Sequence, residues 1–190
     1  MNFQDFYDVA KRHKDEHVEN KKKCGGEPYK SFEQLFGFVK NFSENSKGKS
    51  LHILEIGTAV GFTTFVLQQA TNIGKIETIE FHEIHAKIAK ENILQFGGDI
   101  SKINFLVGEA ENILPTLKEN FYDIIFFDGY GAKYFFYTQF EKLLKNNGIL
   151  ITANKFLKST EEKYFKELQN KDRWEFLESF ADTEIYKKIK

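Results

Sequence analysis

The segment that most constrains the fold is residues 51–64, LHILEIGTAVGFTT. Residues 51–56 are almost all apolar, which is typical of a strand buried on both faces of a parallel sheet. Gly57 and Gly61 follow directly, and residues 62–69 return to the helical spacing of apolar side chains. A strand, a glycine-containing turn and a helix in this order predict the opening of a nucleotide-binding βαβ unit.

The two glycines of this turn are expected to serve different purposes. Gly57 lets the backbone turn sharply at the strand end, and Gly61, which lacks a Cβ, lets a ligand approach the main chain. The helix that follows offers free N–H groups and the positive end of its dipole to an anionic ligand group. The alternative is a glycine-containing turn that only packs against the sheet.

The glycine spacing excludes the dinucleotide-binding fingerprint GxGxxG. That fingerprint requires glycines at 57, 59 and 62, whereas the sequence has Ala59 and Phe62. Phenylalanine cannot replace the third glycine, because that glycine allows the helix to pack closely on the strand. The pattern present is instead acid–x–Gly–x–x–x–Gly, formed by Glu55, Gly57 and Gly61.

This pattern resembles motif I of the S-adenosylmethionine (SAM)-dependent methyltransferases. The variant LEIGTAVGFTT is similar to that of the catechol O-methyltransferase-like family, which includes small bacterial O-methyltransferases. The resemblance runs from about residue 28 to the C-terminus and depends on four spaced motifs together. It implies SAM as cofactor and an α/β, Rossmann-like fold: three αβα layers around a mostly parallel seven-stranded sheet with one antiparallel strand.

The apolar patterning predicts five β–α units followed by a terminal hairpin, and right-handed crossovers make such a sheet doubly wound. The expected strands are 51–56, 75–80, 103–107, 122–128, 149–152, 174–180 and 184–189. The expected helices are 31–43, 62–69, 81–95, a short helix ending at 117, a helix ending at 144, and 160–169.

Residues 1–27 are predicted to be a charged N-terminal segment, and residues 28–190 the methyltransferase domain. A short amphipathic helix is expected around residues 3–9. The run Lys21 to Lys23 has two interpretations, a solvated mobile arm or a patch that contacts the phosphates of RNA. The single cysteine, Cys24, excludes an internal disulfide and indicates a cytoplasmic protein, and we expect neither a membrane span nor a secretory signal.

Acids at the ends of the predicted strands are the first candidates for binding the methyl donor. Glu80 ends the second strand, where an acid accepts hydrogen bonds from ribose hydroxyls in nucleotide-binding folds. The resemblance implies that Glu109 and Ala110 line the adenine pocket; the alternative for Glu109 is a helix N-terminal acid that favours the dipole. The expected donor-binding residues are Glu55, Gly57, Thr58, Ala59, Gly61, Thr63, Glu80, Phe81, Gly108, Glu109, Ala110 and Asp128.

Members of the resembled family generally bind a divalent cation, usually magnesium. The resemblance implies ligands at the acid ending strand four and at an Asp-Asn pair after strand five. Asp128 and Asn154 match two of these positions, but Ala153 occupies the third, and a methyl group cannot coordinate a hard cation. We therefore expect Asp128 and Asn154 to be vestigial positions and Mg²⁺ to be a doubtful cofactor. A family lysine is also replaced by Gly131, with Lys133 two residues further on.

The remaining chemical task is to make the acceptor nucleophilic, because SAM is itself an activated methyl donor. Without a metal to lower the pKa of the acceptor hydroxyl, a general base is required. Asp128 is the leading candidate, followed by Lys133, if its pKa is depressed, and Tyr130; ordinary surface or pocket-wall roles are the alternative for these two. Tyr29, Tyr130 and Trp174 could stack on a flat acceptor or face the sulfonium cation, although core packing is favoured for Trp174.

The function predicted first is SAM-dependent O-methyl transfer to a small hydroxylated or aromatic acceptor, without a complete divalent-metal site. A second hypothesis takes a hydroxylated uridine of tRNA as the acceptor, with Lys21 to Lys23, Lys30 and Lys155 on phosphates. A third is a SAM-binding module that has lost catalysis, motivated by Ala153 and Gly131. A fourth, an aminopropyl-transfer enzyme, is less favoured because no acidic cluster suits a polyamine. The resemblance also implies a homodimer as an option.

Overall fold

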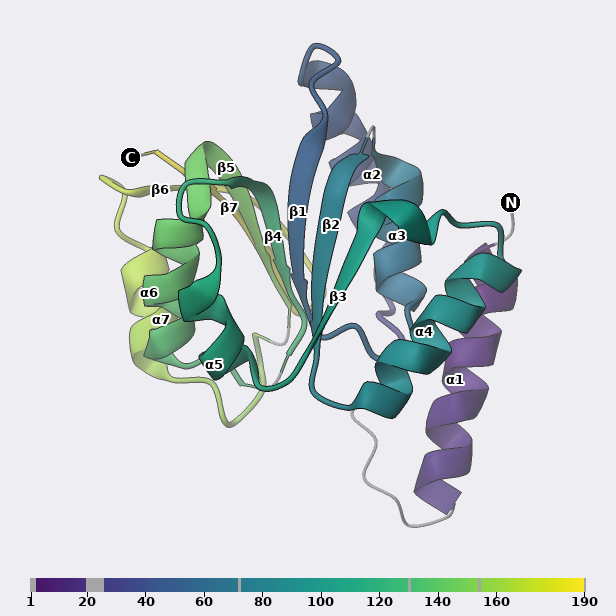
Figure 1. Ribbon diagram of the computed structural model, residues 1–190. Coiled ribbons are helices and arrows are strands. Elements are labelled where there is room, and N and C mark those ends of the chain that lie inside the picture. The colour runs from purple at the N-terminus through teal and green to yellow at the C-terminus, as the bar shows by residue number, and fades with distance from the viewer. Residues whose placement is uncertain (1–2, 20–25, 72, 130, 154, 190) are drawn as a thin grey trace.

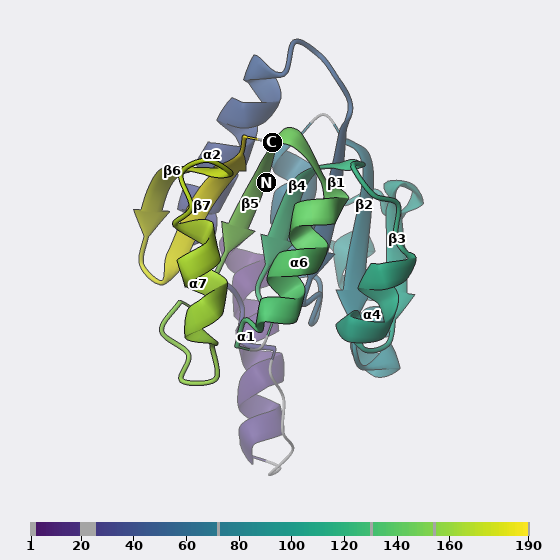
Figure 2. The same ribbon diagram turned by 90° about the vertical axis from the view of Figure 1, so that its left-hand side faces the viewer.

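The computed structural model describes residues 3–19, 26–71, 73–129, 131–153 and 155–189. Its strands are β1 (Leu51–Ile56), β2 (Ile73–Glu80), β3 (Ile103–Val107), β4 (Tyr122–Phe127), β5 (Leu144–Thr152), β6 (Trp174–Phe180) and β7 (Thr183–Lys188). They form one sheet of order β3-β2-β1-β4-β5-β7-β6 (Figures 1 and 2). The pairs from β3 to β5 are parallel, and β7 is antiparallel to β5 and to β6. The predicted sheet, with its one antiparallel strand, is confirmed.

Helices lie on both sides of the sheet and complete the three expected layers (Figure 1). On one side are α1 (Phe3–Glu19), α2 (Phe32–Asn45), α3 (Phe62–Ala70) and α4 (Glu83–Gln95). On the other are α5 (Ala110–Ile113), α6 (Tyr134–Leu143) and α7 (Glu162–Leu168). Two single-turn 3-10 helices, η1 (Ile100–Lys102) and η2 (Leu114–Thr116), complete the set. None of the described helices has the length and apolar content needed to cross a bilayer.

Two hydrophobic cores form because side chains alternate across each strand. Ile53 of β1 and Phe126 of β4 face the core beneath α1 to α4, whereas Leu54 and Ile125 face the core beneath α5 to α7. All four side chains are fully buried. The near-continuous apolar runs that predicted these strands therefore supply side chains to both hydrophobic cores.

The fifth strand begins at Leu144, earlier than the predicted start at 149. Asn147 has a positive φ of 64°, and the pairing of β4 with β5 shifts register between Tyr122 and Ile124. Residues 147 and 148 therefore form an irregularity within β5, not the turn that leads into it. The short helix predicted to end at 117 is divided in two, since α5 gives way to η2 at Leu114, next to Pro115.

Helix α1 packs on the same core as α2 and α3. Phe6 and Ala10 are fully buried, and the Phe6 ring stacks on Phe96 with 4.5 Å between centroids. The amphipathic helix expected around residues 3–9 is confirmed, and it continues to Glu19. Lys21 to Lys23 lie outside the described residues, so both interpretations of that run stay predictions.

Phe6→Ala is expected to lower the free energy of unfolding by about 3–5 kcal/mol, because the buried ring leaves a cavity between Phe62, Phe65 and Phe96. Urea unfolding followed by circular dichroism measures the change. Lys11→Ala, at an exposed position of the same helix, is the control and is expected to change stability by less than about 0.5 kcal/mol. Equal stability of the two variants would contradict the docking of α1.

Candidate active site

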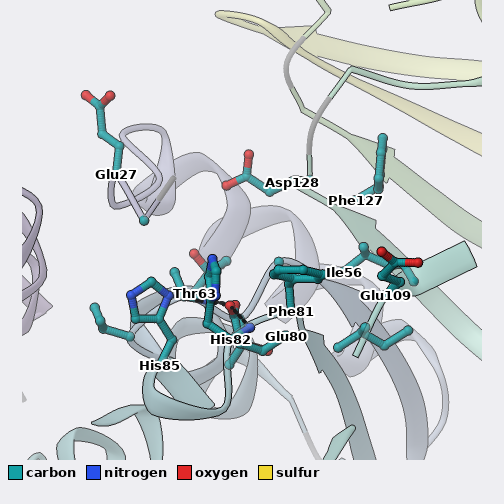
Figure 3. A pocket seen from close by; sticks show the side chains of 18 of the residues that line it. Glu27, Ile56, Thr63, Glu80, Phe81, His82, His85, Glu109, Phe127 and Asp128 are labelled. Atoms are coloured by element: carbon teal, nitrogen blue, oxygen red, sulfur yellow. Dashed lines mark hydrogen bonds and ion pairs between the residues drawn. The ribbon is translucent and has the colours of Figure 1, made fainter. Parts of the chain in front are cut away.

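A cavity of about 770 Å³ lies at the carboxyl ends of β1 to β4 (Figure 3). The sheet order reverses there, between β1 and β4, which is where open α/β sheets bind ligands. The predicted site residues that line it are Gly57, Thr58, Ala59, Thr63, Glu80, Phe81, Gly108, Glu109, Ala110, Asp128 and Lys133. In Figure 3, Glu27 and Asp128 lie along one side of the cavity, and Phe81, His82 and His85 lie along the other.

Gly57 makes the sharp turn that the sequence predicts. Its φ is +103°, and a Cβ at this position would lie 2.7 Å from the main-chain oxygen of Asp128. Both the conformation and the lack of space therefore require glycine. The Gly57 N–H donates to the Ile79 carbonyl at 3.0 Å, which ties the turn to β2.

Gly61 serves helix packing and does not line the cavity. Its φ is +90°, and a Cβ there would lie 3.0 Å from both Cα and Cβ of Ala89 in α4. From the same helix, the Asn92 side chain donates to the Val60 carbonyl at 3.0 Å. The expectation that a ligand approaches the main chain at Gly61 is therefore wrong, because α4 occupies that side of the turn.

Glu80 is an oriented carboxylate in the cavity wall and is only 7% exposed. Its Oε2 accepts from the Ala59 N–H at 2.8 Å, and its Oε1 accepts from the His82 N–H at 2.9 Å. His85 Nδ1 lies 3.4 Å from the same Oε1. Burial raises the pKa of Glu80, but the bonds from His85, His82 and Ala59 outweigh burial and hold the pKa below its ordinary value.

The loop after β3 forms the neighbouring wall of the cavity. The Gly108 N–H donates to the Glu80 carbonyl at 2.9 Å, so the ends of β2 and β3 are joined. Glu109 is the N-cap residue of α5. Its side chain makes no capping bond to a main-chain N–H of the helix, but its Oε2 accepts from the Asn112 side chain at 3.1 Å. Glu109 therefore lines the cavity and also stands at a helix N-terminus. The ring of Phe81 is 52% exposed at this end of the cavity.

Glu55 is not brought to the cavity. It is fully buried beneath the turn, where its Oε2 accepts from the hydroxyls of Thr64 at 2.5 Å and Thr78 at 2.6 Å. Because the Thr78 proton is used in this way, Thr58 donates to the Thr78 oxygen at 2.6 Å. Burial raises the pKa of Glu55 to about 7 against the effect of the two hydroxyls, and the charge of Glu80 adds to the rise. Glu55 thus supports the turn from below instead of binding a ligand.

Asp128 and Lys133 both line the cavity, and the role of Asp128 as a general base stays a prediction. The Asp128 N–H donates to the Ile56 carbonyl at 3.1 Å, which fixes the end of β4 beside β1. Lys133 Nζ pairs with Glu111 Oε1 at 2.9 Å, and this hydrogen bond raises the pKa of Lys133. The condition for Lys133 as a general base, a depressed pKa, is not met. Tyr130 lies outside the described residues.

The residues expected at a divalent-metal site do not fit one. Ala153 is buried and carries no ligand atom on its side chain, and Asn154 lies outside the described residues. Within the described ranges, no group of three His, Cys, Asp or Glu side chains is arranged to hold a metal ion. At Gly131 a Cβ would collide with the main chain and hydroxyl of Ser159, so this backbone has no room for the family lysine.

The N-terminal part of the chain supplies a wall that the sequence did not reveal. Ala10 and Lys14 of α1, together with residues 26–28, line the cavity, as do His82 and His85. Ala10 and Lys14 are one helical turn apart, and such spacing shows a shared face without showing what that face contacts.

Tyr29 and Trp174 are core residues. Tyr29 is buried, bonds to Thr183 Oγ1 at 2.5 Å and meets the Phe126 ring edge-on, so it is not in position to stack on an acceptor. Trp174 is buried, and its Nε1 donates to the Tyr137 hydroxyl at 3.4 Å. The core role favoured for Trp174 is confirmed.

Glu55→Gln is expected to remove a pH dependence of stability. The ordinary pKa of 4.5 rises to about 7 in the folded chain, so Glu55 keeps its proton to a higher pH when folded than when unfolded. The wild type therefore loses stability as pH rises through this window, by up to about 3 kcal/mol, whereas glutamine mimics the neutral form throughout. Urea unfolding between about pH 5 and pH 8 measures the difference.

The control for this measurement is Glu119→Gln, at an exposed position. It is expected to follow the wild type across the same pH range. A difference between Glu55→Gln and wild type that stays constant with pH would show that Glu55 is ionised in the folded protein.

The comparisons with known proteins agree with this site. The protein-family model described as O-methyltransferase matches residues 43–175. A catechol O-methyltransferase of Mycobacterium tuberculosis is 32% identical over 107 residues, which cover 56% of this chain and 48% of that protein. A polyamine aminopropyltransferase of Prochlorococcus marinus is 27% identical over 128 residues, which cover 62% of this chain and 45% of that protein. The chain thus spans less than half the length of these curated relatives.

Among solved structures, an SAH-bound methyltransferase of Podospora anserina superimposes with a TM-score of 0.71 at 19% identity, over 99% of this chain and 87% of that chain. This likeness confirms the Rossmann-like methyltransferase fold. The family match covers more than half of the chain, from α2 into β6, and includes every strand end that borders the cavity. The chain therefore belongs to the O-methyltransferase family, as the segment around Gly57 and the acid at Glu80 predicted.

Proposed function

We propose that this protein transfers a methyl group from SAM to an oxygen of a small hydroxylated or aromatic acceptor. The observation that carries the proposal is the carboxylate of Glu80, which lines the cavity, is oriented by main-chain N–H groups and has its pKa held below the ordinary value. An acid at this strand end is the group that accepts ribose hydroxyls in nucleotide-binding α/β folds. Membership of the O-methyltransferase family supports the same chemistry.

The residues around Glu80 fit the parts of a sulfonium nucleoside. Glu80 Oε2 accepts one hydrogen bond from protein and retains capacity for a ribose hydroxyl. The start of α3, at Thr63, has no side-chain cap, so its N–H groups suit the anionic end of the donor. Phe81 and Ala110 would border the adenine. SAM supplies a methyl group already activated by the sulfonium, so alignment of the acceptor is the main task of the protein.

Asp128 is the proposed general base. It lies on the side of the cavity opposite Phe81 and His82, where the acceptor would approach (Figure 3). As the acceptor oxygen bonds to the methyl carbon, the bond from that carbon to the sulfonium sulfur would break and S-adenosylhomocysteine would leave. The proton of the acceptor hydroxyl would pass to a carboxylate oxygen of Asp128. Since Ala153 offers no ligand, no step of this proposal depends on a divalent cation.

Aminopropyl transfer is the second candidate, and two observations favour it. Polyamine aminopropyltransferases are among the relatives, and the carboxylates of Glu27 and Asp128 lie on the same side of the cavity (Figure 3). Glu27, however, already pairs with Lys30 at 2.8 Å, which reduces its value for an ammonium group. Mass spectrometry of products separates the candidates, because the acceptor gains either a methyl or an aminopropyl group.

Transfer to tRNA and assembly into a homodimer stay predictions. A salt-sensitive gel shift with tRNA would support the first, because lysine contacts to phosphates weaken as salt rises.

Glu80→Ala is expected to weaken binding of SAM by about 5- to 150-fold, which corresponds to about 1–3 kcal/mol, because charge-assisted bonds to the ribose are lost. Isothermal titration calorimetry measures the affinity, with circular dichroism to confirm folding. Glu83→Ala, an exposed acid three residues on in α4, is the matched control and is expected to bind as the wild type does. Failure of the wild type to bind SAM at millimolar concentration would contradict the proposed function. Unchanged affinity in Glu80→Ala would show that Glu80 does not bind the ribose hydroxyls.

Asp128→Asn is expected to lower kcat by about 10²- to 10⁴-fold on any phenolic acceptor that the wild type methylates, because the amide cannot take the acceptor proton. Initial rates with and without a chelator, and after adding magnesium, form the second arm of the experiment. Rates within about twofold of one another are expected in that arm. Loss of activity on chelation that magnesium restores would contradict metal-independent transfer.

A further inference from the structure

Two histidines connect helix α1 to the carboxylate of Glu80. His85 Nδ1 lies 3.4 Å from Glu80 Oε1, and His85 Nε2 lies 3.4 Å from Nε2 of His13 in α1. His85 is buried, so this bridge is largely shielded from water. We propose that His13 and His85 are positioning residues that couple the docking of α1 to the orientation of Glu80, so that binding of the nucleoside also closes α1 over the cavity. The coupling depends on the proposed ribose-binding role of Glu80.

The bridge has a direction because a neutral imidazole has one donor and one acceptor nitrogen. Glu80 is acceptor-only when ionised, so His85 donates from Nδ1. When both rings are neutral, the Nε2 of His85 accepts and His13 donates from its own Nε2. The hydrogen bonds thus run from α1 through α4 to the end of β2, and each fixes the ring orientation of the next group.

The contact of His13 with His85 lies in the outer half of α1. The inner half is held by Phe6 and Ala10, which are fully buried. Beyond Ala10, among side chains that the structure describes, only His13 and Lys14 are half-buried, whereas residues 11, 12, 15 and 16 are exposed. His13 is therefore a half-buried polar contact of this half with α4, and moving it would also move Lys14, which lines the cavity.

Several other groups face the bridge. The His82 ring meets the His85 ring edge-on with 5.2 Å between centroids. Across the cavity, Glu27 feels the positive charge of Lys14, which helps to lower the pKa of Glu27, although the bond from Lys30 is the larger cause. Docking of α1 thus places the Lys14 cation near the carboxylate of Glu27 in the cavity wall.

Coupling of this kind is reciprocal. If docked α1 improves donor affinity by some factor, then bound donor must favour docked α1 by the same factor. A merely structural histidine would change the docking of α1 equally with and without the donor. The two cases can therefore be separated by measuring the hydrogen exchange of the α1 amides with and without a bound nucleoside.

The test compares four variants by calorimetry with S-adenosylhomocysteine (SAH) and by hydrogen exchange of the α1 amides with and without SAH. His13→Ala and His85→Asn are expected to weaken SAH binding by about 3- to 10-fold and to abolish the slowing of α1 exchange that SAH causes in the wild type. Asparagine at 85 retains a donor near the Nδ1 position for Glu80 but cannot reach His13. His13→Gln, with a donor near the Nε2 position, is expected to restore both properties. Lys11→Ala, exposed on the same helix, is the control and should match the wild type.

Each outcome decides between the claims. If SAH binds the wild type but α1 exchange is the same with and without it, or if His13→Ala binds SAH as the wild type does, the coupling is overturned while the proposed function stands. A His13→Ala variant that loosens α1 equally in both states also overturns it. If the wild type does not bind SAH at all, the proposed function fails and the coupling fails with it.

Discussion

The carboxylate of Glu80 holds together segments that are far apart in the sequence. It accepts from the turn after β1 through Ala59, and from the start of α4 through His82 and His85. A buried carboxylate without such partners would be strongly destabilising, so the turn, the strand end and the helix must be placed together for any of them to be stable. The same bonds orient the charge before a ligand arrives, and this lowers the entropic cost of binding a nucleoside.

The glycine motif is explained by the protein around it more than by a ligand. Gly57 is required by the backbone of Asp128, and Gly61 is required by Ala89. Between them, Ala59 adopts a positive φ of 46°, which directs its N–H to Glu80. The turn is thus a packed junction that leaves one side open to the cavity. Its chemistry is delivered by main-chain N–H groups and by the neighbouring acid, not by the glycines themselves.

The sequence predicted what depends on local pattern. Strand β3 has the predicted bounds. Glu80 could be predicted as a site residue because ligands of open α/β sheets bind at the carboxyl ends of the strands, and Glu80 is the last residue of β2. The start of β5 was missed because residues 147 and 148 have the composition of a turn but form an irregularity inside the strand. The contact of His13 with His85 joins residues 72 apart, and no helical periodicity encodes the partner of a helix face.

The departure from the family pattern at Gly131 has a packing reason. Because residue 131 is glycine, the segment around Ser159 can lie directly against it. That contact continues in the bond from the Glu161 N–H to the Ala132 carbonyl at 2.8 Å, so the wall beside Asp128 is closed by main chain. A lysine at 131 would force this wall apart, and Ala153 could not recruit a cation to replace its charge. In the proposed acceptor site, Asp128 would be the reactive group among the described residues on that side, and selectivity would come from the shape of the wall and from α1.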